Sequence, residues 1–306
     1  MIIKRIMAML LIITMAVTQV PNLATATAES EDPAGSVTGH INQEGNPSED
    51  DQLEVTSTLT DMSAIILSHS NHMKRISSAP DYTLAVMTDG RVLAWGDNSY
   101  GQCNVPYALV DVVQVSAGSY HSLALKSDGT VVAWGSNEYG QCGVPEDLSN
   151  VSAVSAGGAH SLALKTDGTV VAWGNNNLGQ CNVPADLSEV VAVSAGGYHS
   201  LVLKADGTVT AWGYAEWNQL DIPPELMNPE TAGIVAIAAP WGHNLAIRKD
   251  GTVFSWGYDI YGQATIPNDL DHVVAVSGSY SQSVALKVDG SVVTWGYNNP
   301  GPLLPP

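Results

Sequence analysis

The stretch VVQVSAGSYHSLALKSDGTVVAWGSNEYGQCGVP, residues 112–145, decides the fold because the chain repeats it. In register with this stretch, a tryptophan followed by a glycine occurs six times, at spacings of 39, 39, 39, 44 and 39 residues. These tryptophans are Trp95, Trp134, Trp173, Trp212, Trp256 and Trp295. A period near 40 residues is typical of propeller blades, which are stable only when stacked because one blade cannot bury its own apolar faces.

Each repeat contains four short segments that favour β-strands, which in this stretch are residues 112–117, 121–126, 130–134 and 141–144. Asp128-Gly129 between the second and third segments is a tight-turn signal. The pattern predicts an all-β protein, a β-propeller of six four-stranded blades built from 39-residue repeats. A seventh blade could be assembled from residues 53–75, but nothing there matches the pattern. The longer fourth repeat has its extra residues between Pro224 and Gly233.

The N-terminal segment has the layout of a secretory signal peptide. Lys4 and Arg5 precede an apolar run over residues 6–17, and small residues suited to cleavage occupy 24–28. The run is too short to span a bilayer stably. We therefore predict a signal peptide over residues 1–28, an acidic flexible lead-in over 29–62, and the propeller over 63–306, with one extra strand expected at 64–67. The protein is expected to be secreted to the extracellular space as a monomer.

The charge limits the possible partners. Two of the 11 basic residues lie in the predicted signal peptide and all 30 acidic residues lie beyond it, so nine basic residues remain and the net charge is −21. Phosphate backbones are bound through lysine and arginine, so this balance argues against nucleic acid and anionic membranes as partners. It favours partners that carry basic patches.

The consensus AGxxHSLALKxDGTVxAWGxNxxGQxxVP over residues 76–306 resembles the repeat of the regulator of chromosome condensation family. In character the chain is most similar to the secreted branch of propeller-type β-lactamase inhibitory proteins. The resemblance implies a propeller that binds other proteins. It also implies that aromatic residues at the AGxxH loop position contact the partner, which here are Tyr120, Tyr198, Trp241 and Tyr280. Ala159 departs from this pattern in the third repeat.

Residues that recur in register are interpreted as scaffold. His121, His160, His199 and His243 occupy one repeat position, and we expect them to tie blades together by hydrogen bonds rather than to bind metal. A catalytic pair of histidine with the adjacent serine fails because neighbours on a strand point to opposite faces. The Asp-Gly pairs are expected to be hairpin turns, since they lack the alternating ligands of a calcium loop. We find no catalytic cluster, so we predict no enzymatic activity, no metal and no cofactor.

The three cysteines, Cys103, Cys142 and Cys181, lie one repeat apart. Leu220, Ala264 and Leu303 take the same position in later repeats, which indicates a buried apolar slot. A disulfide remains an alternative in an exported protein, although the count is odd.

Aromatic residues outside the repeat pattern are the candidate binding site. In an antiparallel meander, the loop between the first and second strands and the loop after the third strand emerge at the same end of each blade. The partner-binding residues predicted there are Tyr120, Tyr198, Trp217, Trp241, Tyr280, Tyr214, Tyr258 and Tyr297. Tyrosine and tryptophan give large, rigid contact areas with a polar tip, as hot spots of interfaces require. Tyr100, Tyr139 and Tyr261 fit equally well as packing residues of the loop.

Two functions remain open. The first is a secreted protein-binding propeller, most concretely an inhibitor that caps an enzyme such as a class A β-lactamase. The second is a surface propeller that binds carbohydrate or cell-wall glycan by stacking sugars on the aromatic rings. In a glycan-binding propeller, hydrogen bonds to the sugar would come from the asparagines Asn98, Asn137, Asn176 and Asn298. These asparagines recur in register, which first suggests that they are turn residues. A contiguous aromatic patch favours the first function, and separate pockets between blades favour the second.

Overall fold

The computed structural model describes residues 73–297. The predicted signal peptide, the lead-in, the strand at 64–67 and the last nine residues lie outside this range, and so these expectations stay predictions.

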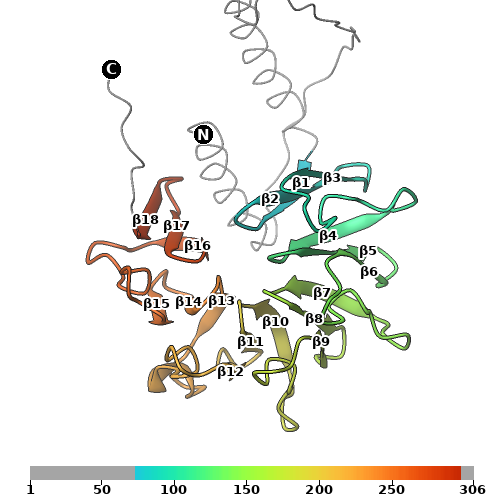
Figure 1. Ribbon diagram of the computed structural model, residues 1–306. Coiled ribbons are helices and arrows are strands. Elements are labelled where there is room, and N and C mark those ends of the chain that lie inside the picture. Colours follow the sequence, from blue (N-terminus) through green and yellow to red (C-terminus); the bar gives the residue numbers. More distant parts are fainter. Residues whose placement is uncertain (1–72, 298–306) are drawn as a thin grey trace, which may run out of the picture. The chain divides into compact units, whose positions relative to one another are not determined.

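The described chain forms six antiparallel sheets of three strands, each made of consecutive strands, arranged around a common centre (Figure 1). We number these sheets as blades 1 to 6. Blade 1 comprises β1 (Met73–Ser78), β2 (Tyr82–Met87) and β3 (Val92–Gly96). Blade 2 comprises β4 (Val112–Ala117), β5 (His121–Lys126) and β6 (Val131–Gly135). Blade 3 comprises β7 (Val151–Ala156), β8 (His160–Lys165) and β9 (Val170–Gly174). Blade 4 comprises β10 (Val190–Ala195), β11 (His199–Lys204) and β12 (Val209–Gly213). Blade 5 comprises β13 (Ile234–Ala238), β14 (His243–Arg248) and β15 (Val253–Gly257). Blade 6 comprises β16 (Val273–Gly278), β17 (Gln282–Lys287) and β18 (Val292–Gly296).

The predicted number of six blades matches the six sheets, but the prediction of four strands per blade is wrong. The segment expected as a fourth strand, residues 141–144 in blade 2, is a turn followed by irregular chain. Its backbone bonds are local, because Gly143 donates to the Gly140 carbonyl at 2.9 Å and Val144 donates to the Cys142 carbonyl at 3.0 Å. An N–H that is used within the loop cannot extend a strand ladder, and the following Pro145 has none to give.

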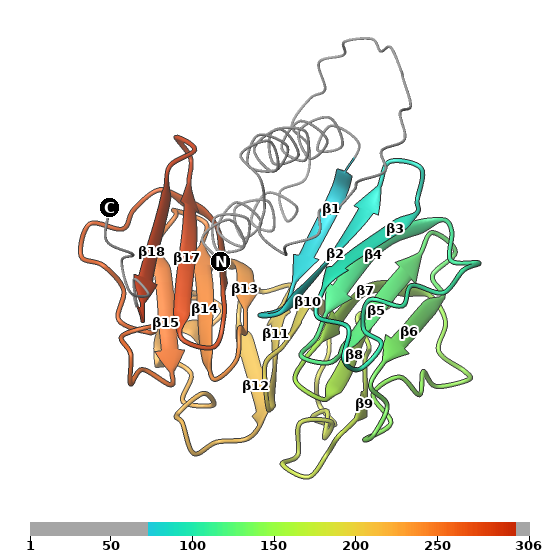
Figure 2. The same cartoon turned by 45° about the horizontal axis from the view of Figure 1, so that its top comes forward.

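The core lies between neighbouring blades. The middle strand of each blade is almost wholly buried, as in β5, where only Lys126 is partly exposed. Leu123 and Leu125 of β5 pack in one cluster with Val154 and Trp173 of blade 3. Neighbouring blades stand beside one another in chain order (Figure 2). The same contact repeats between them, so the large residues of one blade fill the space beside the small residues of the next. Burial of these faces on both sides explains why the repeat is stable only as an array.

The Asp-Gly pairs form hairpin turns, which confirms their interpretation. Gly129 has a φ of 82°, in the left-handed region that glycine favours. The Asp128 carboxylate accepts hydrogen bonds from the Thr130 amide at 3.0 Å and the Thr130 hydroxyl at 2.6 Å. These bonds lower the pKa of Asp128 to about 2. The aspartate therefore fixes the turn.

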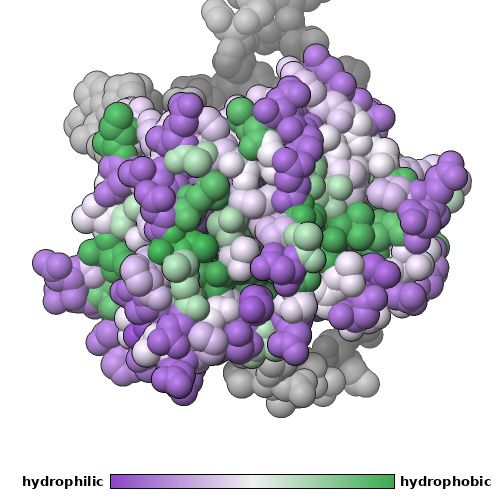
Figure 3. Space-filling model, turned by 90° about the horizontal axis from the view of Figure 1, so that it is seen from below, coloured by the Kyte–Doolittle hydropathy of each residue, from purple (hydrophilic) through white to green (hydrophobic). Residues whose placement is uncertain are grey.

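The longer link of the fourth repeat folds as a short 3-10 helix, η1 (Pro224–Leu226), which buries Leu226 completely. In residues 73–297, no helix has the length and apolar character needed to cross a membrane. The side of the molecule seen in Figure 3 carries small hydrophobic patches separated by hydrophilic ones. No single apolar surface dominates that view.

Candidate functional site

The strand pairing sets the two ends of each blade. In blade 2, His121 pairs with Gly135, so the loop before β5 and the loop after β6 lie at one end. Lys126 pairs with Val112, so the Asp-Gly turn and the link between blades lie at the other end. We call these the loop end and the hairpin end. The arrangement agrees with the meander expected from the sequence.

The recurring histidines join neighbouring blades, as predicted. Nε2 of His121 lies 3.0 Å from the Ser161 hydroxyl of the next blade, and the Ser161 hydroxyl donates to the Gln141 carbonyl at 2.9 Å. Trp173 donates its indole N–H to the same carbonyl, also at 2.9 Å. Since the serine hydroxyl already donates its only proton, it must accept from the histidine, and the proton lies on Nε2. We call this set of bonds the blade latch.

The same latch recurs at His160, His199 and His243, with Asn244 in place of serine as the partner of His199. All four histidines are completely buried. Burial lowers the pKa of His160 to about 3 and of the other three to about 4. The latch pairs histidine with serine, but both side chains are buried and bonded between blades, so the arrangement serves structure.

The three cysteines are free thiols and only half-buried. The Cys142 thiol donates to the Ser136 carbonyl at 3.1 Å, and the other two cysteines make the equivalent bond. Burial raises the pKa of Cys142 and Cys181 to about 11. The expected apolar slot is therefore also a weak hydrogen-bond site that closes the loop after the third strand.

Aromatic side chains of blades 4 to 6 form a continuous network at the loop end. Tyr198 lies 5.4 Å from Trp241, 6.1 Å from Trp217 and 6.2 Å from Tyr214 between ring centroids. Trp217 lies 5.1 Å from Tyr258, which continues the network into blade 5. Trp241 and Tyr258 contact Tyr280 of blade 6, and Tyr258 contacts Tyr261, which contacts Tyr297. We call the eight residues the aromatic surface: Tyr198, Tyr214, Trp217, Trp241, Tyr258, Tyr261, Tyr280 and Tyr297.

Two loop glycines make room for the indoles of this surface. A Cβ on Gly197 would come within 2.8 Å of the Trp241 ring, and a Cβ on Gly242 would come within 2.8 Å of the Trp217 ring. Gly197 also donates its amide to the Trp241 carbonyl at 2.8 Å. Each indole therefore lies against the backbone of a neighbouring loop. This support was not predicted, although the Gly-Gly pair before Tyr198 is its signal in the sequence.

The structure brings together seven of the eight predicted residues, with Tyr261 added. Tyr120 is the exception, since it contacts Tyr100 at 4.7 Å and no member of the aromatic surface within residues 73–297. Blade 3 separates the two groups, because Ala159 and Leu178 take its aromatic positions. Tyr280 and Tyr297 remain exposed by 44% and 47%, and the other predicted rings of the surface are half-buried.

The network also changes the acidity of its members. The Tyr214 hydroxyl donates to the Glu216 carboxylate at 3.0 Å. Loss of water around the ring, together with this bond, raises the pKa of Tyr214. Burial also raises the pKa of Tyr258. These tyrosines stay neutral near pH 7, and so they offer contact area and hydroxyl donors rather than reactive groups.

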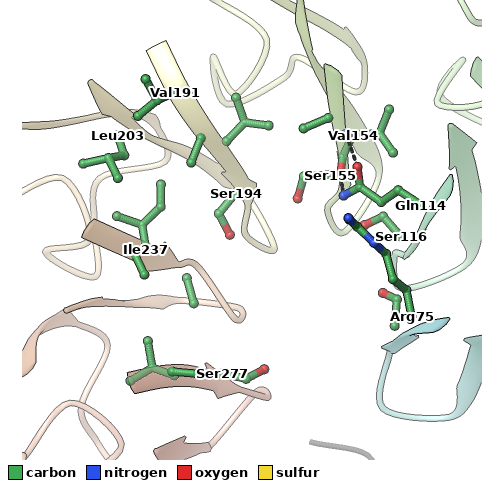
Figure 4. Close-up of a pocket in the computed structure, with 18 of the residues that line it drawn as sticks. Arg75, Gln114, Ser116, Val154, Ser155, Val191, Ser194, Leu203, Ile237 and Ser277 are labelled. Atoms are coloured by element: carbon green, nitrogen blue, oxygen red, sulfur yellow. Dashed lines mark hydrogen bonds between the residues drawn. The ribbon is translucent and has the colours of Figure 1, made fainter. Parts of the chain in front are cut away.

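A second candidate site is the central cavity, of about 440 Å³, which lies among the first strands of the six blades. Gln114 bridges two of these strands, donating to the Val154 carbonyl at 3.0 Å and accepting from the Val154 amide at 3.2 Å. Figure 4 shows Arg75 beside Ser116 and Gln114, opposite the apolar side chains of Val191 and Ile237. Among residues 73–297, Arg75 is the one charged residue of this lining, and no group of three or more possible metal ligands occurs in that range.

The fold and the loop-end surface define a class of protein, a propeller of tandem repeats with an aromatic surface at one end. The sequence matches the model of the regulator of chromosome condensation (RCC1) repeat over residues 74–102, 112–141, 151–180, 190–218 and 234–263. The chain belongs to this family of repeat propellers. No curated protein matches the sequence.

Similar solved structures include Prp20p of Saccharomyces cerevisiae, with 22% identity, a TM-score of 0.62, and coverage of 74% of this chain and 72% of that chain. Human WBSCR16 has 24% identity, a TM-score of 0.61, and coverage of 74% and 77%. The ectodomain of the Physcomitrella patens receptor kinase CR4 has 20% identity, a TM-score of 0.60, and coverage of 73% and 61%. At these identities the likeness concerns the fold. The description of Prp20p names binding to Gsp1p and histones, which is a property of that protein.

Proposed function

We propose that this chain is a secreted binding protein that uses the aromatic surface to hold another protein. The observation that carries the proposal is the continuity of eight aromatic side chains across three blades at one end. Buried tyrosine and tryptophan anchors of about 2 kcal/mol or more each could supply most of the roughly 12 kcal/mol that nanomolar binding requires.

The most concrete version is an inhibitor that covers the active site of an enzyme such as a class A β-lactamase. Inhibition of this kind needs no chemistry from the propeller, because the aromatic surface only has to exclude substrate. The support is the resemblance of the repeat to secreted inhibitory propellers. Tyr198, Trp241 and Tyr280 lie in the loop between the first and second strands in three successive blades, Tyr198 directly before the middle strand and the other two one residue earlier.

A glycan-binding function is the second candidate. Stacked aromatic rings also suit sugars, but the expected hydrogen-bond partners are already engaged. Asn98 donates to Asn104 at 2.7 Å and accepts from the Cys103 amide at 2.8 Å. Asn137 and Asn176 accept the equivalent bonds of their own loops, which supports their interpretation as turn residues. The continuous network, rather than separate pockets, favours a protein partner.

The test is a double variant, Tyr198→Ala with Trp241→Ala, compared with Tyr107→Ala. Tyr107 lies in the link at the hairpin end and is fully exposed, so its removal matches the loss of an aromatic ring away from the surface. The double variant should abolish inhibition of a class A β-lactamase in a nitrocefin assay, and the control should inhibit like the unaltered protein. Melting temperatures should agree within a few degrees.

Retention on insoluble cell-wall glycan, with loss in the same double variant, would instead establish the second candidate. Unfolding of the double variant would mean that these two residues belong to the scaffold. Equal activity of both variants would show that the aromatic surface is not the binding site.

A further inference from the structure

The basic residues are distributed unevenly between the two ends of the blades. From residue 76 to residue 297, every lysine and arginine lies at the hairpin end. Lys126, Lys165, Lys204, Arg248 and Lys287 end middle strands, and Arg91 and Lys249 lie in the turns. Five of the seven are paired with aspartate, as Lys126 is with Asp128 at 3.3 Å. Most of the basic side chains at the hairpin end are therefore already paired within the chain.

The loop end has acidic groups and no lysine or arginine in the described chain. Asp97 and Asp259 stabilise their own loops, since Asp97 accepts from Ser99 at 2.6 Å and Asp259 accepts from the Ala264 amide at 2.6 Å. Glu138 and Glu216 are exposed, and neither has an ion pair within residues 73–297. Glu216 contacts the aromatic surface directly, since it accepts from Tyr214 and adjoins Trp217 in the sequence.

A carboxylate beside tyrosine and tryptophan rings matches the chemistry of an arginine side chain. The guanidinium group stacks on aromatic faces, is attracted by their negative π-clouds, and makes paired hydrogen bonds to a carboxylate. Tyr214 and Trp217 meet nearly at right angles, with centroids 4.9 Å apart, so the two rings form a corner. Tyr198 closes the third side of this corner, in contact with both.

We propose that the partner presents an arginine from a basic segment to the corner formed by Tyr198, Tyr214, Glu216 and Trp217. This inference rests on the proposed function, because it specifies what kind of protein the aromatic surface binds. A partner surface rich in carboxylates would be repelled by the loop end, which has no cation to receive it. A neutral sugar would leave Glu216 without a matching charge.

The probe is a tetra-arginine peptide, compared with tetra-lysine and tetra-glutamate peptides at 150 mM salt. The readout is the indole N–H signals of uniformly ¹⁵N-labelled protein, assigned through tryptophan variants. Trp217 and Trp241 should shift on addition of tetra-arginine. Trp134, Trp173, Trp212 and Trp256 should not shift, because their indoles donate to buried carbonyls between blades. These four signals report any unspecific effect on the scaffold.

Two matched variants locate the charge. Glu216→Gln keeps the size of the side chain and should weaken tetra-arginine binding by about five- to tenfold, as loss of one partly exposed charge-assisted contact implies. Glu230→Gln removes the same charge from the exposed link at the hairpin end and should leave binding unchanged. Tetra-lysine should bind more weakly than tetra-arginine, and tetra-glutamate should not shift Trp217.

Equal shifts with tetra-arginine and tetra-glutamate, or equal weakening by the two variants, would overturn the proposal. These results are independent of the β-lactamase and glycan assays. If tetra-arginine fails to bind but the Tyr198 and Trp241 variants still abolish partner binding, the arginine site is wrong and the proposed function stands. If both experiments fail, the aromatic surface has no binding role.

Discussion

Acidification should unfold this protein at a pH where most of its carboxylates are still ionised. The cause is the four latch histidines, which are completely buried and neutral in the folded chain. Their pKa is about 3 to 4 when folded and 6.5 when exposed to water. The unfolded chain therefore binds more protons than the folded one, and stability falls as the pH drops from 6.5 towards 4.

The size of the effect follows from this difference. At pH 5, an unfolded histidine with a pKa of 6.5 gains about 2 kcal/mol from its proton, since each pH unit below the pKa contributes about 1.4 kcal/mol. A histidine that stays neutral in the folded state does not bind this proton, so the free energy of unfolding falls by the same amount. Four such residues remove about 8 kcal/mol, which is comparable to the whole stability of a typical domain. The value depends mainly on the unfolded pKa, so it holds for any folded pKa below 5.

The assay is urea unfolding followed by circular dichroism between pH 7.5 and 4.5. Near pH 5 the free energy of unfolding should fall by about 5 kcal/mol per pH unit, which corresponds to four protons taken up. The hydrogen-bonded aspartates contribute at a lower pH than the histidines. Because their pKa values are lowered in the folded chain, their protonation reduces the free energy of unfolding only below about pH 3.8.

A single variant provides the matched control. His160→Gln places an amide donor where the sixth repeat already has Gln282, and it should reduce the slope near pH 5 by one quarter. The reasoning is refuted if the free energy of unfolding is flat from pH 7 to 4.5. It is equally refuted if the imidazole of His160 titrates near pH 6.5 in the folded protein.

Three further outcomes are expected. Gly197→Ala should displace the Trp241 ring, because its Cβ would lie 2.8 Å from that ring, and the fluorescence spectrum should change with little loss of the urea midpoint. Ser161→Ala should leave the buried Nε2–H of His121 without an acceptor and cost about 1–3 kcal/mol in urea unfolding, whereas a cost below 0.5 kcal/mol would contradict the latch. Cys142 should react slowly with iodoacetamide at pH 8 as judged by mass spectrometry, because burial holds its pKa near 11, and rapid labelling would show that the thiol is accessible.

The scaffold was predictable from the sequence because it repeats. The recurrence of His121 and its equivalents indicated a structural bond, and the latch to the next blade confirms that interpretation. The strand count was wrong because the pattern at 141–144 alternates like a strand. The side-chain oxygen of Gln141 accepts the Tyr139 amide at 2.9 Å, so this segment folds on itself instead of pairing.

The candidate site was predictable only in part. Periodicity and strand direction placed the aromatic residues at one end, but contacts between side chains depend on which blades carry them. Tyr120 is separated from the others by blade 3, where Ala159 leaves a break in the series. Tyr261 looked like a packing residue, yet it links Tyr258 to Tyr297. Such contacts join side chains of neighbouring blades, so the sequence of a single repeat does not predict them.

The separation between strands that make the blade latch and loops that carry the aromatic side chains has an evolutionary consequence. Every latch bond is made by side chains inside the strands or by a main-chain carbonyl, so the latch does not depend on which side chains the loops carry. Substitutions in those loops can accumulate while the architecture persists. A lineage built on this repeat is thus free to change its binding target by altering a few loop positions, and duplication of a repeat would supply a further loop to vary.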